Sequence, residues 1–184
     1  DALAAFDEMA NGGVREPTTR TDSFVAAFGS EADREPLLQE VEHIRGAGQE
    51  VSYDVLDGEE ARSLEPALSG QVGAALRLNG QRFINPGAYV QSLADAFVVR
   101  GGHLIVGDEV TGIIDDGAGV QLSGRRFDRA VIATGAWLGT LARQFGVRRV
   151  VQSGRGYSFS VAVSEPLRGP IYLPVQRVAC TPIG

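Results

Sequence analysis

The sequence predicts a mixed fold of helices and strands, of the α+β or α/β class, from three observations. Residues 130–133 form a short apolar run, typical of a buried strand, and a helical pattern follows directly after Thr134 and Gly135. Residues 51–56 alternate between apolar and polar side chains, as in a half-buried strand. Asn85 and Pro86 stand before apolar residues at helical spacing, which is typical of a helix start.

The first half of the chain carries local signals for where helices begin. Ser30 is expected to cap a helix, with Asp33 at the capping-box position, and Asp57 with Glu60 repeats the arrangement. The elements expected here are a helix tail over 1–10, a strand over 21–29, a helix over 30–46, a strand over 51–56 and a short helix after 57.

A hairpin is expected next, with strands over 72–78 and 81–84 joined by Asn79-Gly80. A helix from Asn85 to about Gly101 follows it. The remaining elements expected are strands over 103–106, 110–114, 120–122 and 130–133, a helix over 137–145 that Gly146 ends, and a strand over 150–163.

Composition and charge narrow the function classes. The net charge of −6, with arginines scattered among acids, argues against a nucleic-acid partner. No apolar stretch reaches the length of a membrane span. One cysteine and two histidines indicate neither a disulfide nor a metal site, and we expect a reducing, cytoplasmic location.

The Thr134-Gly135 turn is the strongest candidate for a ligand contact. A backbone without bulky side chains can approach a flat ligand closely, and open α/β sheets bind ligands where strands lead into helices. The alternative is a strand–turn–helix unit without a ligand. The G-x-G-x-x-G dinucleotide fingerprint is absent from this sequence.

Residues 131–137 (VIATGAW) resemble the ATG motif of flavoprotein oxidoreductases, in particular the family of D-amino acid oxidase, glycine oxidase and D-amino acid dehydrogenase. The segments 83–94 and 100–104 (RGGHL) resemble family segments that precede this motif. Residues 151–160 resemble the strand that leads back into the substrate domain. The resemblance runs from about residue 21 to residue 160.

The resemblance implies a cofactor, FAD, that lies against Ala133, Thr134 and Gly135. It also implies that Val110 meets the adenine through its backbone, although its side chain could equally be core. Trp137 would pack over the cofactor or belong to the core. The family's N-terminal dinucleotide-binding unit and its C-terminal segment are expected to lie outside this chain, so that the chain alone is expected to be inactive.

The implied domains are a partial, Rossmann-like FAD-binding layer and a discontinuous antiparallel-sheet domain for the substrate. The layer takes residues 85–146. The sheet domain takes residues 21–84 and 147–184, and residues 1–20 form a helix tail and linker.

Three side chains are candidates for binding the substrate. Arg82 and Arg155 can each offer two parallel donors to a carboxylate, and the alternative is a solvated arginine. Tyr157 can orient a substrate through its hydroxyl, or can simply lie on a strand face. No catalytic acid or base is assigned, because a flavin accepts the hydride itself.

The resemblance implies oxidation of the C–N bond of a small D-amino acid or secondary amine to an imine, which water converts to an oxo acid. One alternative is a non-catalytic α+β binding or interaction domain. Another is a related flavoprotein with a different substrate, such as a thiazole-pathway oxidase or a glycerol-phosphate-type dehydrogenase.

Overall fold

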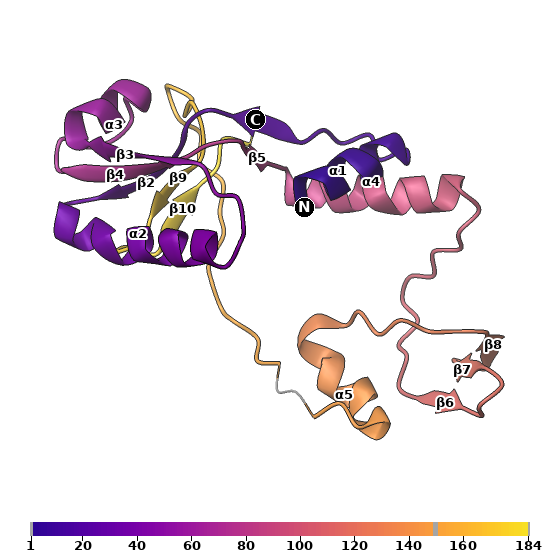
Figure 1. The fold of residues 1–184 in the computed structure, drawn as a ribbon. Helices are drawn as coiled ribbons and strands as arrows, with labels where there is room; N and C mark the ends of the chain where they lie inside the picture. The colour runs from indigo at the N-terminus through magenta and orange to yellow at the C-terminus, as the bar shows by residue number, and fades with distance from the viewer. Residues whose placement is uncertain (1, 149–150, 184) are drawn as a thin grey trace. The chain divides into compact units, whose positions relative to one another are not determined.

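The computed structural model confirms the mixed fold of helices and strands (Figure 1). It describes residues 2–148 and 151–183. These form two units: one runs up to Gly102 and resumes at Ala162, and the other spans His103–Val161. Each unit is described by itself below. No helix in the described residues is both long and apolar enough to cross a membrane.

The first unit is built on a five-stranded sheet with the strand order β10-β9-β2-β4-β3. Neighbouring strands are antiparallel, except that β2 and β9 run parallel. The bounds are β2 Phe24–Phe28, β3 Tyr53–Asp57, β4 Ala74–Leu78, β9 Ile171–Leu173 and β10 Val178–Cys180.

Helices cover both faces of this sheet. Successive residues of a strand point to opposite sides, and β2 and β4 carry apolar residues on both. Ala26 and Phe28 of β2 pack on one face with Val41 of helix α2 (Glu31–Gly46). Val25 and Ala27 pack on the other face with residues of helix α3 (Gly58–Leu64). The core therefore lies in two layers, one on each side of β2 and β4.

The predicted helix caps are confirmed. The Ser30 hydroxyl accepts a hydrogen bond from the Asp33 backbone N–H at 3.3 Å. Asp57 and Glu60 form a reciprocal capping box at the start of α3, with donor–acceptor distances of 2.8 and 2.9 Å. Asn85 caps helix α4 (Pro86–Val99). These caps depend on residues three positions apart, so the sequence pattern is sufficient to find them.

The predicted hairpin at Asn79-Gly80 is wrong in its pairing. Gly80 has the positive φ of a turn residue, at 68°. However, the strand that follows it, β5 (Gln81–Phe83), pairs with β1 (Thr19–Thr21) and not with β4. The two edges of β4 are already occupied by β2 and β3, so β4 has no free edge for the return strand.

The single strand predicted over residues 21–29 is also divided. It forms β1 and β2, with a break at Asp22 and Ser23. The Thr21 side chain accepts a hydrogen bond from the Ser23 backbone N–H at 3.0 Å, which turns the chain locally. The break allows β1 and β2 to join different sheets.

A buried carboxylate ties the C-terminal segment to the end of α3. The Glu65 side chain is 1% exposed, and it accepts hydrogen bonds from the backbone N–H of Arg168 at 2.7 Å and of Ala67 at 3.2 Å. The Arg168 guanidinium donates back to the carbonyls of Ser63 and Leu64. This clasp joins residues 103 positions apart in the chain.

We expect Glu65→Ala to lower the free energy of unfolding by roughly 2 to 4 kcal/mol, because it leaves two backbone donors without acceptors and opens a void. Urea denaturation of the purified protein measures this. The exposed Glu40 provides the control, because Glu40→Ala should change stability by no more than about 0.5 kcal/mol. Equal effects of the two substitutions would show that the clasp does not stabilise the fold.

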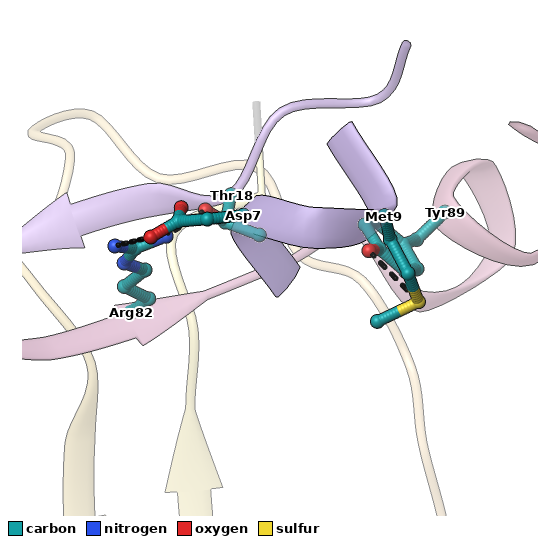
Figure 2. Close-up of polar contacts among 5 residues, drawn as sticks. All are labelled: Asp7, Met9, Thr18, Arg82 and Tyr89. Carbon is teal, nitrogen blue, oxygen red and sulfur yellow. Dashed lines mark hydrogen bonds and ion pairs between the residues drawn. The ribbon is translucent and has the colours of Figure 1, made fainter. Parts of the chain in front are cut away.

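Helix α1 (Ala2–Asn11) packs against α4 in the first unit. The rings of Phe6 and Tyr89 meet edge to face with centroids 5.3 Å apart. The Tyr89 hydroxyl lies 3.8 Å from the Met9 sulfur (Figure 2). Tyr89 is the buried residue of α4, whereas Val90 and Val99 are 65% and 81% exposed. Much of the apolar surface of α4 is therefore uncovered by this unit.

The second unit contains a three-stranded meander of β6 (Ile113–Asp115), β7 (Val120–Leu122) and β8 (Arg125–Phe127). The helical region after Thr134 consists of a 3-10 turn (Gly135–Trp137), α5 (Leu138–Ala142) and a second 3-10 turn (Arg143–Phe145). Gly146 ends it with a φ of 80°, as predicted.

The strands predicted over residues 103–106, 130–133 and 150–163 are not formed in the described residues. Val150 lies outside the description, and residues 151–163 contain no strand. A strand requires a neighbour to accept and donate its backbone hydrogen bonds. These segments have no such neighbour within the described chain, and Val131 is 91% exposed. The apolar pattern indicates burial, which the described residues do not provide for these segments.

Candidate functional site

The corner at Thr134 and Gly135 turns the extended chain into the helical region. The Thr134 carbonyl accepts a hydrogen bond from the Trp137 backbone N–H at 3.1 Å. Gly135 has a φ of 54°, in the left-handed region that favours glycine. Leu141 and Ala142, about two turns further on, are buried and anchor the helix.

The described part of the second unit leaves the Gly135 side of this corner open. Apart from its neighbours in the chain, a Cβ built on Gly135 has no described atom within 4 Å. The Trp137 side chain is 74% exposed, so it is not part of the core of its unit. The backbone at Gly135 is therefore accessible to a flat ligand.

The Thr134 hydroxyl is a buried polar group without a partner. Its Oγ1 atom makes no hydrogen bond to any residue that the structure describes and is closed to solvent. Leaving a buried hydroxyl unpaired costs about 1 to 3 kcal/mol. This unpaired buried hydroxyl distinguishes Thr134 from a simple turn residue.

The other proposed cofactor contacts lie in the same unit. Val110 is half-buried and precedes β6, while Ala133 is exposed next to Thr134. The structure gives no contact that brings Val110 to the corner, so its role stays a prediction. Within the described residues, no group of three or more His, Cys, Asp or Glu side chains could hold a metal ion.

The Arg82 guanidinium already holds a carboxylate of this chain (Figure 2). Its Nη1 and Nη2 atoms lie 2.5 and 3.1 Å from the two carboxylate oxygens of Asp7, and Thr18 accepts a third hydrogen bond at 3.3 Å. The Arg82 side chain is only 10% exposed. A substrate carboxylate would have to displace Asp7 to use this arginine.

The Asp7–Arg82 pair makes stability depend on pH. The hydrogen bond from Arg82 lowers the pKa of Asp7 below its ordinary value of 3.8. A carboxyl with a depressed pKa in the folded state stabilises the fold above its unfolded pKa, and this stabilisation is lost as the pH falls through the folded pKa. Asp7→Asn should therefore lower the melting temperature at neutral pH, with a difference that shrinks below about pH 4.

Asp22 is exposed and provides the control for this titration. Melting curves of wild type, Asp7→Asn and Asp22→Asn between neutral and acid pH measure the effect. A difference between wild type and Asp7→Asn that does not change with pH would contradict the prediction.

Arg155 and Tyr157 lie in the second unit, in the segment without a strand. Both are exposed, and Tyr157 is 94% exposed. Their roles in binding the substrate stay predictions.

The sequence analysis missed Arg77 of β4. Its Nε atom is buried without a hydrogen-bond partner in the described residues, and its Nη1 lies 3.7 Å from Asp54. The register places Asp54 opposite Arg77. A signal was present, because Arg77 interrupts the otherwise apolar strand AALRL. A charged side chain in such a strand is unusual without a partner.

Comparisons with known proteins agree with this fold. The chain superimposes on a crystal structure of glycine oxidase from Geobacillus kaustophilus with a TM-score of 0.70 and 22% identity, over 94% of this chain and 48% of that one. It is 24% identical to a D-amino acid dehydrogenase of Rhizorhabdus wittichii, over 90% of this chain and 42% of the relative. It is 25% identical to one of Sinorhizobium medicae, over 99% of this chain and 47% of the relative.

The fold is thus shared with a glycine oxidase. The sequence model of one family, DAO, described as FAD dependent oxidoreductase, matches residues 1–182. The chain belongs to this family of oxidoreductases, as its resemblance predicts. It spans about half the length of the curated relatives it matches.

Proposed function

We propose that this chain contributes to an enzyme that oxidises the C–N bond of a small D-amino acid or secondary amine to an imine, which water hydrolyses to an oxo acid. Family membership supports this proposal, as do two relatives named D-amino acid dehydrogenase. The structural observation that carries it is the uncovered corner at Gly135 beside the unpaired hydroxyl of Thr134.

These residues fit an FAD. The exposed backbone at Ala133 and Gly135 would admit the flat face of the cofactor. The buried Thr134 hydroxyl would gain a hydrogen-bond partner if the atoms that close it to solvent moved aside for the cofactor. Val110 would contact the adenine through its backbone, and Trp137 would pack over the cofactor. When bound, FAD accepts a hydride from the carbon that carries the amino group.

The exposed apolar surface supports assigning residues 85–146 to a cofactor layer. Val99 of α4 and Val131 before the corner are 81% and 91% exposed, which is unusual for apolar side chains at such positions. Segments 103–106 and 130–133 have strand-like sequences without partners. Further strands of the same enzyme would pair with these segments and cover the valines.

The five-stranded sheet and its helices would form part of the substrate domain. Arg155 and Tyr157 are proposed to reach the substrate, with the guanidinium binding a carboxylate and the hydroxyl orienting the amine. Arg82 would take part only if the substrate replaced Asp7. In all three cases the side chains position the substrate and accept none of its electrons.

The test uses the complete gene product, purified and mixed with D-alanine without oxygen. Loss of the oxidised-flavin absorbance and formation of pyruvate and ammonia are expected. L-Alanine is the stereochemical control and glycerol 3-phosphate the control for a different substrate class. Absence of flavin, together with a melting temperature that added FAD does not change, would favour a non-catalytic binding domain.

A further inference from the structure

A groove lies in the first unit between α3 and the β3–β4 pair, away from the residues assigned above. Its volume is about 540 Å³, and Leu56 and Leu64 are among the residues that line it. Ser63, Glu59 and Arg77 add polar groups to the same lining. The groove therefore combines apolar walls with one guanidinium and several acceptors, as small-molecule sites do.

The cationic side of the groove is incompletely paired. The Arg77 side chain makes no hydrogen bond to a residue in the described chain, and its ion pair with Asp54 is long, at 3.7 Å. Its buried Nε–H is without an acceptor. An arginine can donate two parallel hydrogen bonds to one carboxylate, so Arg77 is suited to bind one.

The anionic side of the groove also has one unused group. Asp57 and Glu60 use their carboxylates in the capping box at the start of α3. By contrast, the exposed Glu59 side chain makes no hydrogen bond or ion pair with the residues that the structure describes. Glu59 can therefore accept from an ammonium group without breaking an existing contact.

The charges favour one class of ligand. The lining carries charges of both signs, with the carboxylates of Asp57, Glu59 and Glu60 at α3 and the guanidinium of Arg77 on β4, so each end of a ligand with two opposite charges meets a group of opposite sign. We infer that the groove binds a small zwitterionic amino acid, with its carboxylate on Arg77 and its ammonium group on Glu59. This inference does not require FAD. The amino acid is either the substrate of the enzyme or a second molecule that binds apart from the reaction.

The binding experiment uses the complete gene product with its flavin already reduced by dithionite, so that D-alanine is not consumed. D-Alanine, propanoate and ethylamine are titrated separately, and backbone NMR shifts locate the binding. D-Alanine should shift the amides of Ser63 and Leu64. Shifts confined to other residues would overturn the inference.

Two substitutions separate the ends of the ligand. Arg77→Met should weaken the binding of D-alanine and of propanoate about tenfold and leave the binding of ethylamine almost unchanged. Glu59→Gln should weaken the binding of D-alanine and of ethylamine about threefold, without weakening the binding of propanoate. The matched controls are Arg126→Met, in the meander, and Glu40→Gln, on α2, which should bind all three probes as wild type does.

Melting curves show whether each variant folds. If Arg77→Met does not fold, Arg77→Lys tests whether Arg77 binds the carboxylate, because lysine keeps the charge and loses the forked geometry. Arg77→Lys should bind D-alanine at least about threefold more weakly. D-Alanine binding equal to wild type in a folded Arg77 variant would overturn the inference.

Flavin reduction then distinguishes the two sources of the ligand. If Arg77→Met raises the KM for D-alanine about tenfold at unchanged kcat, the groove holds the substrate. If Arg77→Met abolishes the NMR shifts of the groove amides but leaves the KM unchanged, the groove holds a second amino acid. Groove shifts without any flavin reduction would support the inference and count against the proposed function alone.

Discussion

Gly135→Val is expected to weaken FAD binding at least about 100-fold in the complete gene product, a loss of about 2.7 kcal/mol. The branched side chain would occupy the space beside the Gly135 backbone, where a built Cβ meets no described atom within 4 Å apart from its neighbours in the chain. FAD content after purification and titration of the apoprotein with FAD measure the effect. Flavin fluorescence provides the binding signal.

Gly146→Val is the matched control for backbone strain. Gly146 also has a positive φ, at 80°, and apart from its neighbours in the chain a built Cβ there meets no described atom within 4 Å. Both substitutions should destabilise the fold by about 1 to 2 kcal/mol, because an L-residue is strained in this conformation. FAD affinity should fall less than about threefold in Gly146→Val. Equal loss of FAD in both variants would attribute the effect to strain and remove Gly135 from the cofactor site.

Gly58→Ala is expected to lower the free energy of unfolding by about 3 kcal/mol or more. A Cβ on Gly58 would lie 2.1 Å from the carbonyl oxygen of Val72 and 3.0 Å from the Arg62 guanidinium. The Val72 carbonyl cannot retreat easily, because Arg62 donates a hydrogen bond to it at 2.7 Å. Urea denaturation measures the change.

Gly70→Ala is the control for this clash. Gly70 is near Val72 in the chain and lacks a positive φ. Apart from its neighbours in the chain, a Cβ built on Gly70 meets no described atom within 4 Å. It should be neutral, or stabilise by up to about 1 kcal/mol through the unfolded chain. If Gly58→Ala were as stable as Gly70→Ala, the close packing of α3 against residue 72 would be wrong.

Much of the local structure could be predicted from the sequence. Ser30, Asp57 and Asn85 cap helices where the pattern places them, and Gly146 ends the last one. Caps and C-terminal glycines act over three or four residues, so their physical cause lies within the pattern itself. The family resemblance also rests on short, contiguous segments, and the match over residues 1–182 confirms it.

Strand pairing could not be predicted in the same way. Residues 130–133 have the composition of a buried strand, yet they form none in the described chain. Asn79-Gly80 forms a turn, and β5 nevertheless pairs with β1. In both cases the outcome depends on which strand edges are free, and a local pattern carries no information about distant edges.

The sequence by itself determined the class of fold, the family, the helix boundaries and the corner at Thr134 and Gly135. Only the tertiary structure decided that Arg82 is held by Asp7, 75 positions away, while Arg77 keeps an unpaired Nε–H. The physical reason is that backbone conformation follows mainly from neighbouring residues. The partner of a charged side chain is set instead by long-range packing, which brings distant segments within hydrogen-bond reach.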